Sequence, residues 1–189
     1  MKQRKILYLC FFLLLAISTT GFTYNFKAVY LKPRIGGQIS ENELKKYPEI
    51  LVVNSYKKLK SSVNKKVAIW IDKDALKMVD DRMKCNNWLW QRPQNSYPIL
   101  LIGYNDSLYS FTEQLSVFLI IPPHIDWSKT KLEPGFSVCK IIKRNKKSIS
   151  YFMKGYKEHP RTKSILSITN MLLENKFPID SSVENEFPK

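Results

Sequence analysis

The sequence predicts an α/β fold, a single three-layer domain whose mainly parallel sheet has about four parallel strands plus an antiparallel edge hairpin. The parallel strands are expected at short apolar runs rich in branched side chains, as strands buried on both faces should be; these runs are Ile50–Val53, Val67–Ile71, Ile99–Ile102 and Val117–Ile121. Polar segments separate these runs, and two of these segments have the residue spacing of a helix. Strand–helix alternation of this kind is typical of a parallel sheet with right-handed crossovers.

Residues 1–22 have the pattern of an export signal. Basic residues within the first five positions precede the apolar run Ile6–Ile17. That length suits the apolar region of a secretory signal better than a full membrane span, which needs about 20 residues. Ala16 and Ser18 are small residues of the kind that a signal peptidase reads, whereas counting on to Phe22 lengthens the run toward a retained anchor. Residues 1–22 therefore predict either a cleaved signal peptide or an N-terminal membrane anchor. In both cases the body lies outside the cytoplasm, secreted or attached to the cell membrane.

Residues 23–48 are expected to form a linker and a short helix. Pro33 and the pair Gly36-Gly37 interrupt regular structure. The stretch Ser40-Glu41-Asn42-Glu43 has the form of a capping box, so a short helix is expected to begin there.

The α/β domain is expected to span residues 49–178. Helices are expected between its strands, with Ser55 and Asp106 as capping residues for two of them; these helices are Tyr56–Ser62, Ala75–Met83 and Ser107–Leu115. The remaining polar tail, residues 179–189, is expected to be loose.

The pattern changes after Pro134-Gly135. Phe136–Ile142 and Ser148–Met153 flank a basic connector and predict the antiparallel hairpin. Thr162 is then expected to cap a helix over Lys163–Asn175. The apolar stripe of that helix should pack on the sheet; it consists of Ile165, Leu166, Ile168, Leu172 and Leu173.

The net charge of +15 favours partners that carry negative charge. Part of the charge gathers in the hairpin connector, at Lys143, Arg144, Lys146 and Lys147. A membrane surface or an anionic envelope polymer would suit such a patch, and nucleic acid is not expected as a partner. The simpler interpretation, which we favour, is a solvated basic surface on a lysine-rich protein.

Two cysteines remain in the body of the chain. An exported location would permit a disulfide between Cys85 and Cys139. Cys139 alternates within an apolar strand pattern, and buried free cysteines are common, so two separate thiols are favoured. No pair of cysteines has the spacing of a metal site, and the sequence indicates no particular cofactor.

The familiar catalytic signatures are absent from the sequence. It has no glycine-rich phosphate loop, no nucleophile-elbow serine between glycines and no helix with paired zinc-binding histidines. Function must therefore be argued from groups of residues that the fold would bring together.

The clearest such group consists of polar residues that follow the predicted strands, where open α/β sheets usually bind ligands: Asp72, Asp74, Asn105, Asp106, His124 and Asp126. Carboxylates and one imidazole could hold a divalent cation. Alternatively, one of Asp72, Asp106, His124 and Asp126 could act as a general acid or base. The favoured interpretation is more ordinary, because Asp residues just before helices are commonly caps.

Tryptophans near these acids form a second candidate group. Trp88, Trp90 and Trp127, together with Asp74 and Asn105, would suit a carbohydrate, because sugar rings stack on indoles and donate hydrogen bonds to acids. The favoured alternative is that the three indoles close the edge of the core, where large aromatic side chains contribute much buried area.

Two functions follow from these patterns. The favoured one is a non-enzymatic module, exported or membrane-anchored, that binds an anionic or carbohydrate partner at the cell envelope. The alternative is a hydrolase or transferase that acts on an envelope glycan or polymer with strand-end carboxylates and a histidine. Convergence of Asp72, Asp106 and His124 in a concave pocket would favour the enzyme. Carboxylates that merely cap their own helices would favour binding.

Overall fold

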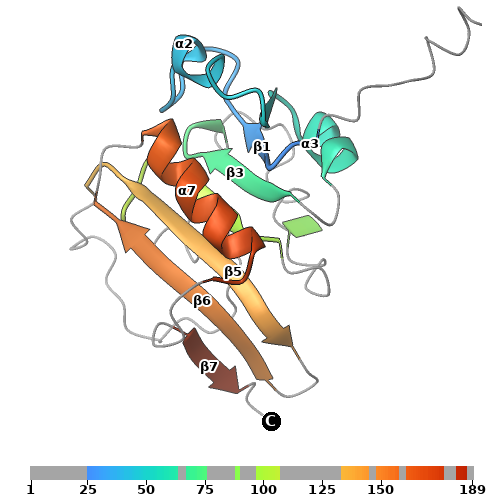
Figure 1. Cartoon of the computed structure of the whole chain (residues 1–189), viewed down its shortest axis with the longest axis vertical. Helices are drawn as coiled ribbons and strands as arrows, with labels where there is room; N and C mark the ends of the chain where they lie inside the picture. Colours follow the sequence, from blue (N-terminus) through green and yellow to red (C-terminus); the bar gives the residue numbers. More distant parts are fainter. Residues whose placement is uncertain are drawn as a thin grey trace, which may run out of the picture.

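The computed structural model describes the chain over residues 25–63, 67–75, 88–89, 97–106, 133–144, 148–157, 161–176 and 182–186, with the backbone alone for 141–151 and 182–186 in these ranges. The described strands form one mixed seven-stranded sheet in the order β2-β1-β3-β4-β5-β6-β7. Helices accompany this sheet (Figure 1), as expected for an α/β fold. Some expected segments lie outside the described residues; they are the N-terminal signal, the strand Val117–Ile121, the helix Ser107–Leu115 and most of the helix Ala75–Met83.

The parallel half of the sheet contains the first strands of the chain. β2 (Ile50–Val53) and β3 (Ala68–Asp72) both pair in parallel with β1 (Ala28–Leu31). β4 (Ile99–Ile102) pairs in parallel with β3, with Asp72 opposite Ile102. The expected strands that fall on described residues are thus found in parallel pairings.

The position of β1 corrects the expectation of a linker over residues 23–48. Ala28–Leu31 is a strand at the centre of the parallel half, and all four of its residues are buried. The run is short and stands between Lys27 and Lys32. Its neighbouring strands and the side chains packed on both faces of the sheet supply its burial, and this information is not local to the segment.

The antiparallel half contains the expected hairpin, but its first strand is longer than expected and includes Lys143 and Arg144 of the predicted connector. β5 (Phe136–Arg144) pairs with β4 on one side and with β6 (Ser148–Tyr156) on the other. The expected loose tail contains a further strand, β7 (Ser182–Glu186), which pairs with β6. The tail is polar, yet its backbone satisfies hydrogen bonds along the edge that β6 would otherwise leave open.

The helices begin largely where the sequence predicts. In α2 (Glu41–Leu44) the Ser40 hydroxyl accepts the backbone N–H of Glu43, and in α3 (Tyr56–Ser62) the Ser55 hydroxyl accepts that of Lys58. These are the expected caps.

The start of α7 (Thr162–Leu173) differs from the expectation. Thr162 is the buried first residue of the helix, and Arg161 occupies the capping position without a side-chain hydrogen bond. Burial of Thr162 places this side chain against the core instead of at the helix end.

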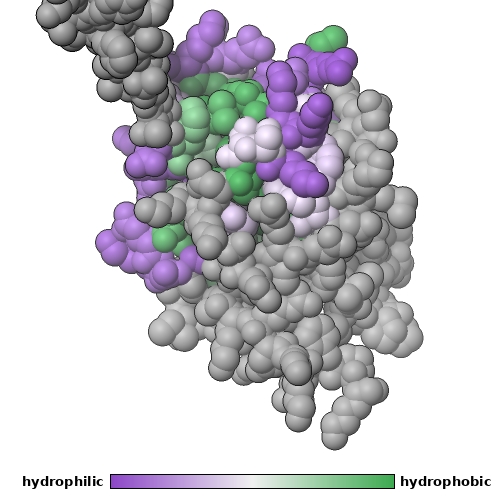
Figure 2. Space-filling model, turned by 90° about the vertical axis from the view of Figure 1, so that its right-hand side faces the viewer, coloured by the Kyte–Doolittle hydropathy of each residue, from purple (hydrophilic) through white to green (hydrophobic). Residues whose placement is uncertain are grey.

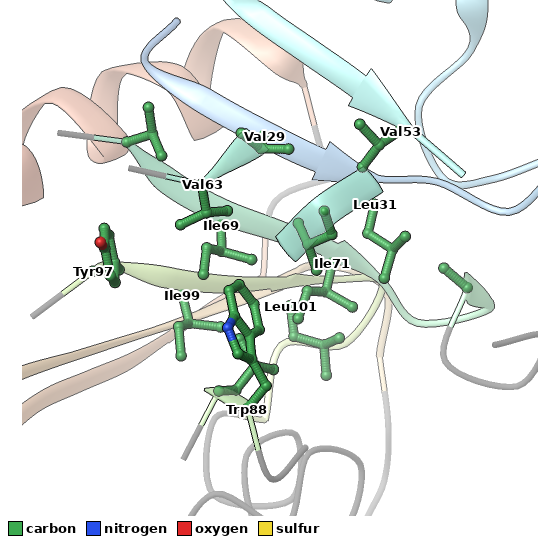
Figure 3. Packing of buried hydrophobic residues seen from close by; sticks show 14 of the residues in the cluster. Val29, Leu31, Val53, Val63, Ile69, Ile71, Trp88, Tyr97, Ile99 and Leu101 are labelled. Carbon is green, nitrogen blue, oxygen red and sulfur yellow. The ribbon is translucent and has the colours of Figure 1, made fainter. Parts of the chain in front are cut away.

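Two clusters of buried side chains lie on opposite faces of the sheet. One includes Leu59 of α3 and the strand residues seen in Figure 3, such as Val29 and Ile69. The other includes Leu44 of α2 and the buried face of α7. The alternation of β-strand side chains thus supplies a core to both faces, as is consistent with an α/β fold.

The side chains of α7 meet the sheet through polar contacts as well as apolar ones. The indole of Trp70 in β3 donates a hydrogen bond of 2.9 Å to the Thr169 hydroxyl. At the other end of the helix, the buried Lys140 ammonium donates to the Leu172 carbonyl and, over 2.6 Å, to the Asn175 side chain. Burial lowers the pKa of Lys140. These bonds satisfy groups that the helix end leaves without intrahelical partners.

The surface near α3 mixes apolar and polar residues. Figure 2 shows apolar described residues gathered in one area of this face, with hydrophilic ones around it.

Within the described part of the chain, no helix has the length and apolar character needed to cross a membrane.

Candidate functional site at the carboxyl edge of the sheet

The strand order creates a topological switch point between β1 and β3. From the end of β1 the chain passes to β2 on one side, and from the end of β3 it passes to β4 on the other side. Because the two connections leave in opposite directions, a crevice is expected outside the carboxyl ends of β1 and β3, where open α/β folds usually bind ligands. We call this side of the sheet the carboxyl edge.

Asp72 lies at this switch point and is fully buried. One carboxylate oxygen accepts the Tyr30 hydroxyl and the Gln38 backbone N–H, each at 2.6 Å. The other oxygen accepts the backbone N–H of Asp74 at 2.9 Å. Burial, the charge of Asp72 and the hydrogen bond to it raise the pKa of Tyr30, so the phenol remains the proton donor. Asp72 therefore joins β1, β3 and the loop after β1.

The loop after β1 folds back over the switch point. Gly36 and Gly37 have positive φ angles of 75° and 109°, which glycine adopts without steric cost. The Gln38 side chain continues the contact by donating to Asp74 over 3.2 Å. We call residues 33–38 the covering loop, since the bonds from Gln38 hold its end against Asp72 and Asp74.

Lys32 is buried beside the covering loop. Its ammonium lies 3.5 Å from the Glu41 carboxylate, and the exposed fractions of the two side chains are 7% and 74%. An exposed partner at this distance gives only a weak ion pair. A lysine with so little exposure is uncommon in proteins, which marks it as a candidate for function.

The loops after β3 and β4 also touch. The Lys73 ammonium stands 4.7 Å from the centre of the Tyr104 ring. A Cβ atom at Gly103 would lie 2.4 Å from the Lys73 side chain, so this glycine permits the close approach. This cation–π contact holds the loop after β3 against the loop after β4 at the carboxyl edge.

Further along the edge, polar contacts reach the antiparallel strands. The Asn105 amide donates to the Glu133 carboxylate over 3.4 Å, and Lys157 lies 3.9 Å from the same carboxylate. The Ser137 hydroxyl donates to the Tyr104 carbonyl at 2.7 Å. The edge thus carries a row of polar and aromatic side chains that we call the rim; its members are Gln38, Asp74, Tyr104, Asn105 and Glu133.

Part of the expected site lies at the carboxyl edge, where, among the expected residues that it describes, the structure shows a bond only between Asp72 and Asp74. Asp72, Asp74, Asn105 and Asp106 follow the neighbouring strands β3 and β4 at the carboxyl edge. Asp72 is buried, whereas the other three are half-buried. The remaining expected members lie outside the described residues; these are His124, Asp126, Trp90 and Trp127, together with the side chains of the basic connector Lys143, Arg144, Lys146 and Lys147.

Trp88 lies in the core on the α3 face. It is 7% exposed, and its ring meets Tyr56 edge to face with ring centres 5.9 Å apart. Figure 3 shows it beside Ile99, in the same buried cluster. This position matches the core-packing interpretation.

Sequence reasoning missed Tyr30, Lys32 and Gln38. Tyr30 lies on β1, Lys32 directly follows it and Gln38 ends the covering loop, so the failure to identify β1 removed all three from consideration. A signal was present, because Lys32 follows a short apolar run and precedes two adjacent glycines. That is the arrangement of a strand followed by a tight loop.

The donor set of the described residues does not indicate a metal centre. Within that part of the chain, no three His, Cys, Asp or Glu side chains gather closely enough to hold a metal ion. Cys139 is a buried free thiol, and its burial raises the thiol pKa. Cys85, the other cysteine in the body of the chain, lies outside the described residues, so the choice between separate thiols and a disulfide stays a prediction.

Comparisons of the chain with protein families, with curated proteins and with solved structures find no match.

Proposed function

We propose that this chain is an exported or membrane-anchored binding module for an anionic or carbohydrate partner at the cell envelope. The observation that carries the proposal is the state of Asp72. Three internal donors occupy its carboxylate, and it has no exposed surface. A carboxylate used in this way organises loops, whereas a general acid or base needs contact with a substrate.

The rim supports a polar ligand. Gln38, Asp74 and Asn105 are half-buried, so each has part of its surface in contact with solvent. Amide and carboxylate groups beside the half-buried ring of Tyr104 are suited to hydroxyl groups and the apolar face of a sugar. The net charge of +15 supports attraction to anionic polymers over longer distances.

The alternative is a hydrolase or transferase that acts on an envelope glycan. Its support is Asp106, which is half-buried after β4 on the same edge as Asp74. In this alternative, Asp106 would work with His124 and Asp126 in acid–base chemistry.

Binding and turnover can be separated with the full chain in detergent. The chain is titrated with a panel of neutral glycans, uronate polymers and polyanionic envelope polymers, and bound ligand is measured by calorimetry. Mass spectrometry of the same mixtures detects any fragments or transferred groups. We expect saturable binding without new products. Catalytic release of fragments would overturn the binding proposal in favour of the enzyme.

Two charge-matched variants locate the binding surface. Asp74→Asn changes the rim, whereas Glu49→Gln changes a carboxylate before β2, at the opposite end of the parallel strands. Both variants remove one negative charge. We expect Asp74→Asn to weaken glycan binding and Glu49→Gln to leave it unchanged. Equal effects would show that net charge, and not the rim, governs binding.

A further inference from the structure

β2 is the last strand of the described sheet on the parallel side, and one of its two sides faces away from β1. The Lys32 N–H donates to the Val53 carbonyl, and β1 also bonds to the carbonyl of Glu49, so odd-numbered positions turn their backbone groups toward β1. Because backbone groups alternate in direction along a strand, the carbonyl of Ile50 and both backbone groups of Val52 turn the other way. We call this the outer side of β2.

β2 has none of the charged residues or prolines that commonly protect the last strand of a sheet. All four of its residues, Ile50–Val53, are apolar. Val52 is 42% exposed and is one of two large apolar side chains that are exposed among the described residues. Within the same part of the chain, β2 pairs with β1 alone. An exposed apolar strand of this kind can pair with another chain through its backbone.

The two faces of the sheet beside the outer side of β2 differ in character. Val52 and Ile50 are two positions apart, so both stand on the face of the sheet that α7 covers. α3 packs on the opposite face, and its lysines Lys57, Lys58 and Lys60 are exposed. Figure 2 views the molecule from the α3 side and shows apolar surface bordered by hydrophilic surface. A strand added beside β2 therefore meets apolar surface on one face and positive charge on the other.

We propose that the outer side of β2 binds an extended peptide segment of a partner protein, in which apolar and acidic residues alternate. The segment adds a strand to the sheet through its backbone. Successive side chains of a strand point to opposite faces, so the apolar ones lie on the face of Val52 and the acidic ones lie toward the lysines of α3. This partner is additional to the ligand proposed for the carboxyl edge.

Charge favours this occupant over a second copy of the chain. Residues 45–63 contain five lysines, all exposed, and a single acid, Glu49. Two copies joined through antiparallel β2 strands would be related by a twofold axis, which would place both α3 helices on the same face of the joined sheet. The lysines of the two helices would then repel each other, as would the net charge of +15 on each chain. An acidic segment turns the same lysines into attractive contacts.

The binding test uses the full chain in detergent and short fluorescent peptides as probes, with binding measured by fluorescence anisotropy. Glu and Val alternate in the first peptide. Lys replaces Glu in the second peptide, and Pro replaces Val in the third. We expect saturable binding of the Glu/Val peptide and at least about tenfold weaker binding of the other two, because one is repelled and the other cannot form a paired strand. Absence of Glu/Val binding, or equal binding of all three peptides, would overturn the proposal.

Variants at Val52 test the backbone pairing. Val52→Pro removes the N–H that faces outward and should weaken Glu/Val binding by about fivefold, which corresponds to one lost hydrogen bond. Val52→Thr keeps that N–H and should bind nearly as well as the unaltered chain. Dimers that form with rising protein concentration and that Val52→Pro abolishes would show a second copy as the occupant, against the proposal.

Charge-matched triple variants test the role of the α3 lysines. Replacement of the three exposed lysines of α3 by glutamine should weaken Glu/Val binding by at least about threefold. The control replaces Lys154, Lys157 and Lys163, which are equally exposed but lie on β6, directly after it and on α7. It removes the same charge and should have little effect. Equal weakening by both triple variants would show that net charge, and not the surface beside β2, selects the peptide.

Hydrogen exchange tests the pairing on the unaltered chain, so the conclusion does not depend on the folding of a variant. Saturating Glu/Val peptide should slow exchange of the Val52 amide. The amide of Leu59 in α3, bonded to the Ser55 carbonyl, is the internal reference and should not change. Peptide binding with an unchanged Val52 amide would overturn the pairing. An amide that already exchanges slowly in the free chain would do the same, since the outer side of β2 would then be occupied.

Discussion

Individual residues at the carboxyl edge perform structural tasks that their positions in the sequence do not reveal. Asp72 was a candidate for a strand-end site, with an ordinary structural role as the favoured interpretation, and its oxygens accept three donors from separate segments. Tyr30 is one of those donors. Its hydroxyl lies in the core, where a lost partner leaves a buried polar group unsatisfied.

Replacement of Tyr30 by phenylalanine should lower the free energy of unfolding by about 1–3 kcal/mol, because the buried Asp72 carboxylate loses one of its donors. Chemical denaturation followed by circular dichroism measures the change. Tyr47→Phe is the matched control, at a half-buried tyrosine packed against the same apolar cluster as Tyr30. For this control we expect the free energy of unfolding to change by no more than about 0.5 kcal/mol, as for a surface substitution. Equal losses at both positions would contradict the role of the Asp72 bond.

Cys139 should make the fold less stable at alkaline pH. Burial raises the pKa of its thiol in the folded state, whereas in unfolded chains a thiol ionises near pH 8.5. Below that pH both states keep the proton and the stabilising contribution is complete. Above it the unfolded state alone loses the proton, so the free energy of unfolding falls by up to about 1.4 kcal/mol per pH unit.

Denaturant titrations between about pH 7 and pH 10 test this dependence, because that pH range includes the pKa of the thiol in the unfolded chain. The Cys139→Ala variant should be less stable at neutral pH but should show a shallower decline above about pH 8.5. Parallel curves for the two proteins would mean that other groups cause the alkaline loss.

At the scale of elements, the apolar stripe of α7 follows its sequence pattern, although the start of the helix does not. Of its expected apolar stripe, Ile165, Leu166 and Leu172 are buried, and Ile168 and Leu173 are half-buried. Strong periodicity over a long segment constrains which face meets the sheet, so this element could be predicted. The capping residue of α7 could not be predicted, because burial of Thr162 depends on the surrounding core.

Leu172→Ala should lower the free energy of unfolding by about 2–5 kcal/mol, since the side chain is fully buried and its removal leaves a cavity. Leu173→Ala, one position along the same helix, is the matched control because Leu173 is half-buried. Its loss should be clearly smaller. Thermal and denaturant unfolding of both variants gives the comparison, and a negligible effect at Leu172 would show that the stripe does not support the core.

At the scale of the whole molecule, the sequence predicted the class of fold better than the site. Parallel pairing followed from strand–helix alternation, and the hairpin from its alternating runs. The site depended on β1, whose four residues resemble a linker until β2 and β3 are placed on either side. Asp72 and Asp74 could be identified from the sequence because the end of a strand is recognised where its apolar run stops. Lys32 was not, because its burial comes from the covering loop and not from its own segment.

The location of the whole molecule is a separate prediction. A reporter that is active only outside the cytoplasm, fused after Lys189, should be active, because the basic start of the chain favours the inner side while the following apolar run crosses or is cleaved. The control fusion lacks residues 1–22 and should be inactive. A well-expressed but inactive full-length fusion would contradict export.

The central place of β1 has a consequence for how the molecule is made. β1 leaves the ribosome before β2 and β3, and both later strands pair with it. Synthesis therefore presents the template first, and each later strand can add to an edge that already exists. A chain that begins after Leu31 would lack the strand that joins β2 to the rest of the sheet. A synthetic peptide carrying Ala28–Leu31 could restore the truncated chain by strand addition.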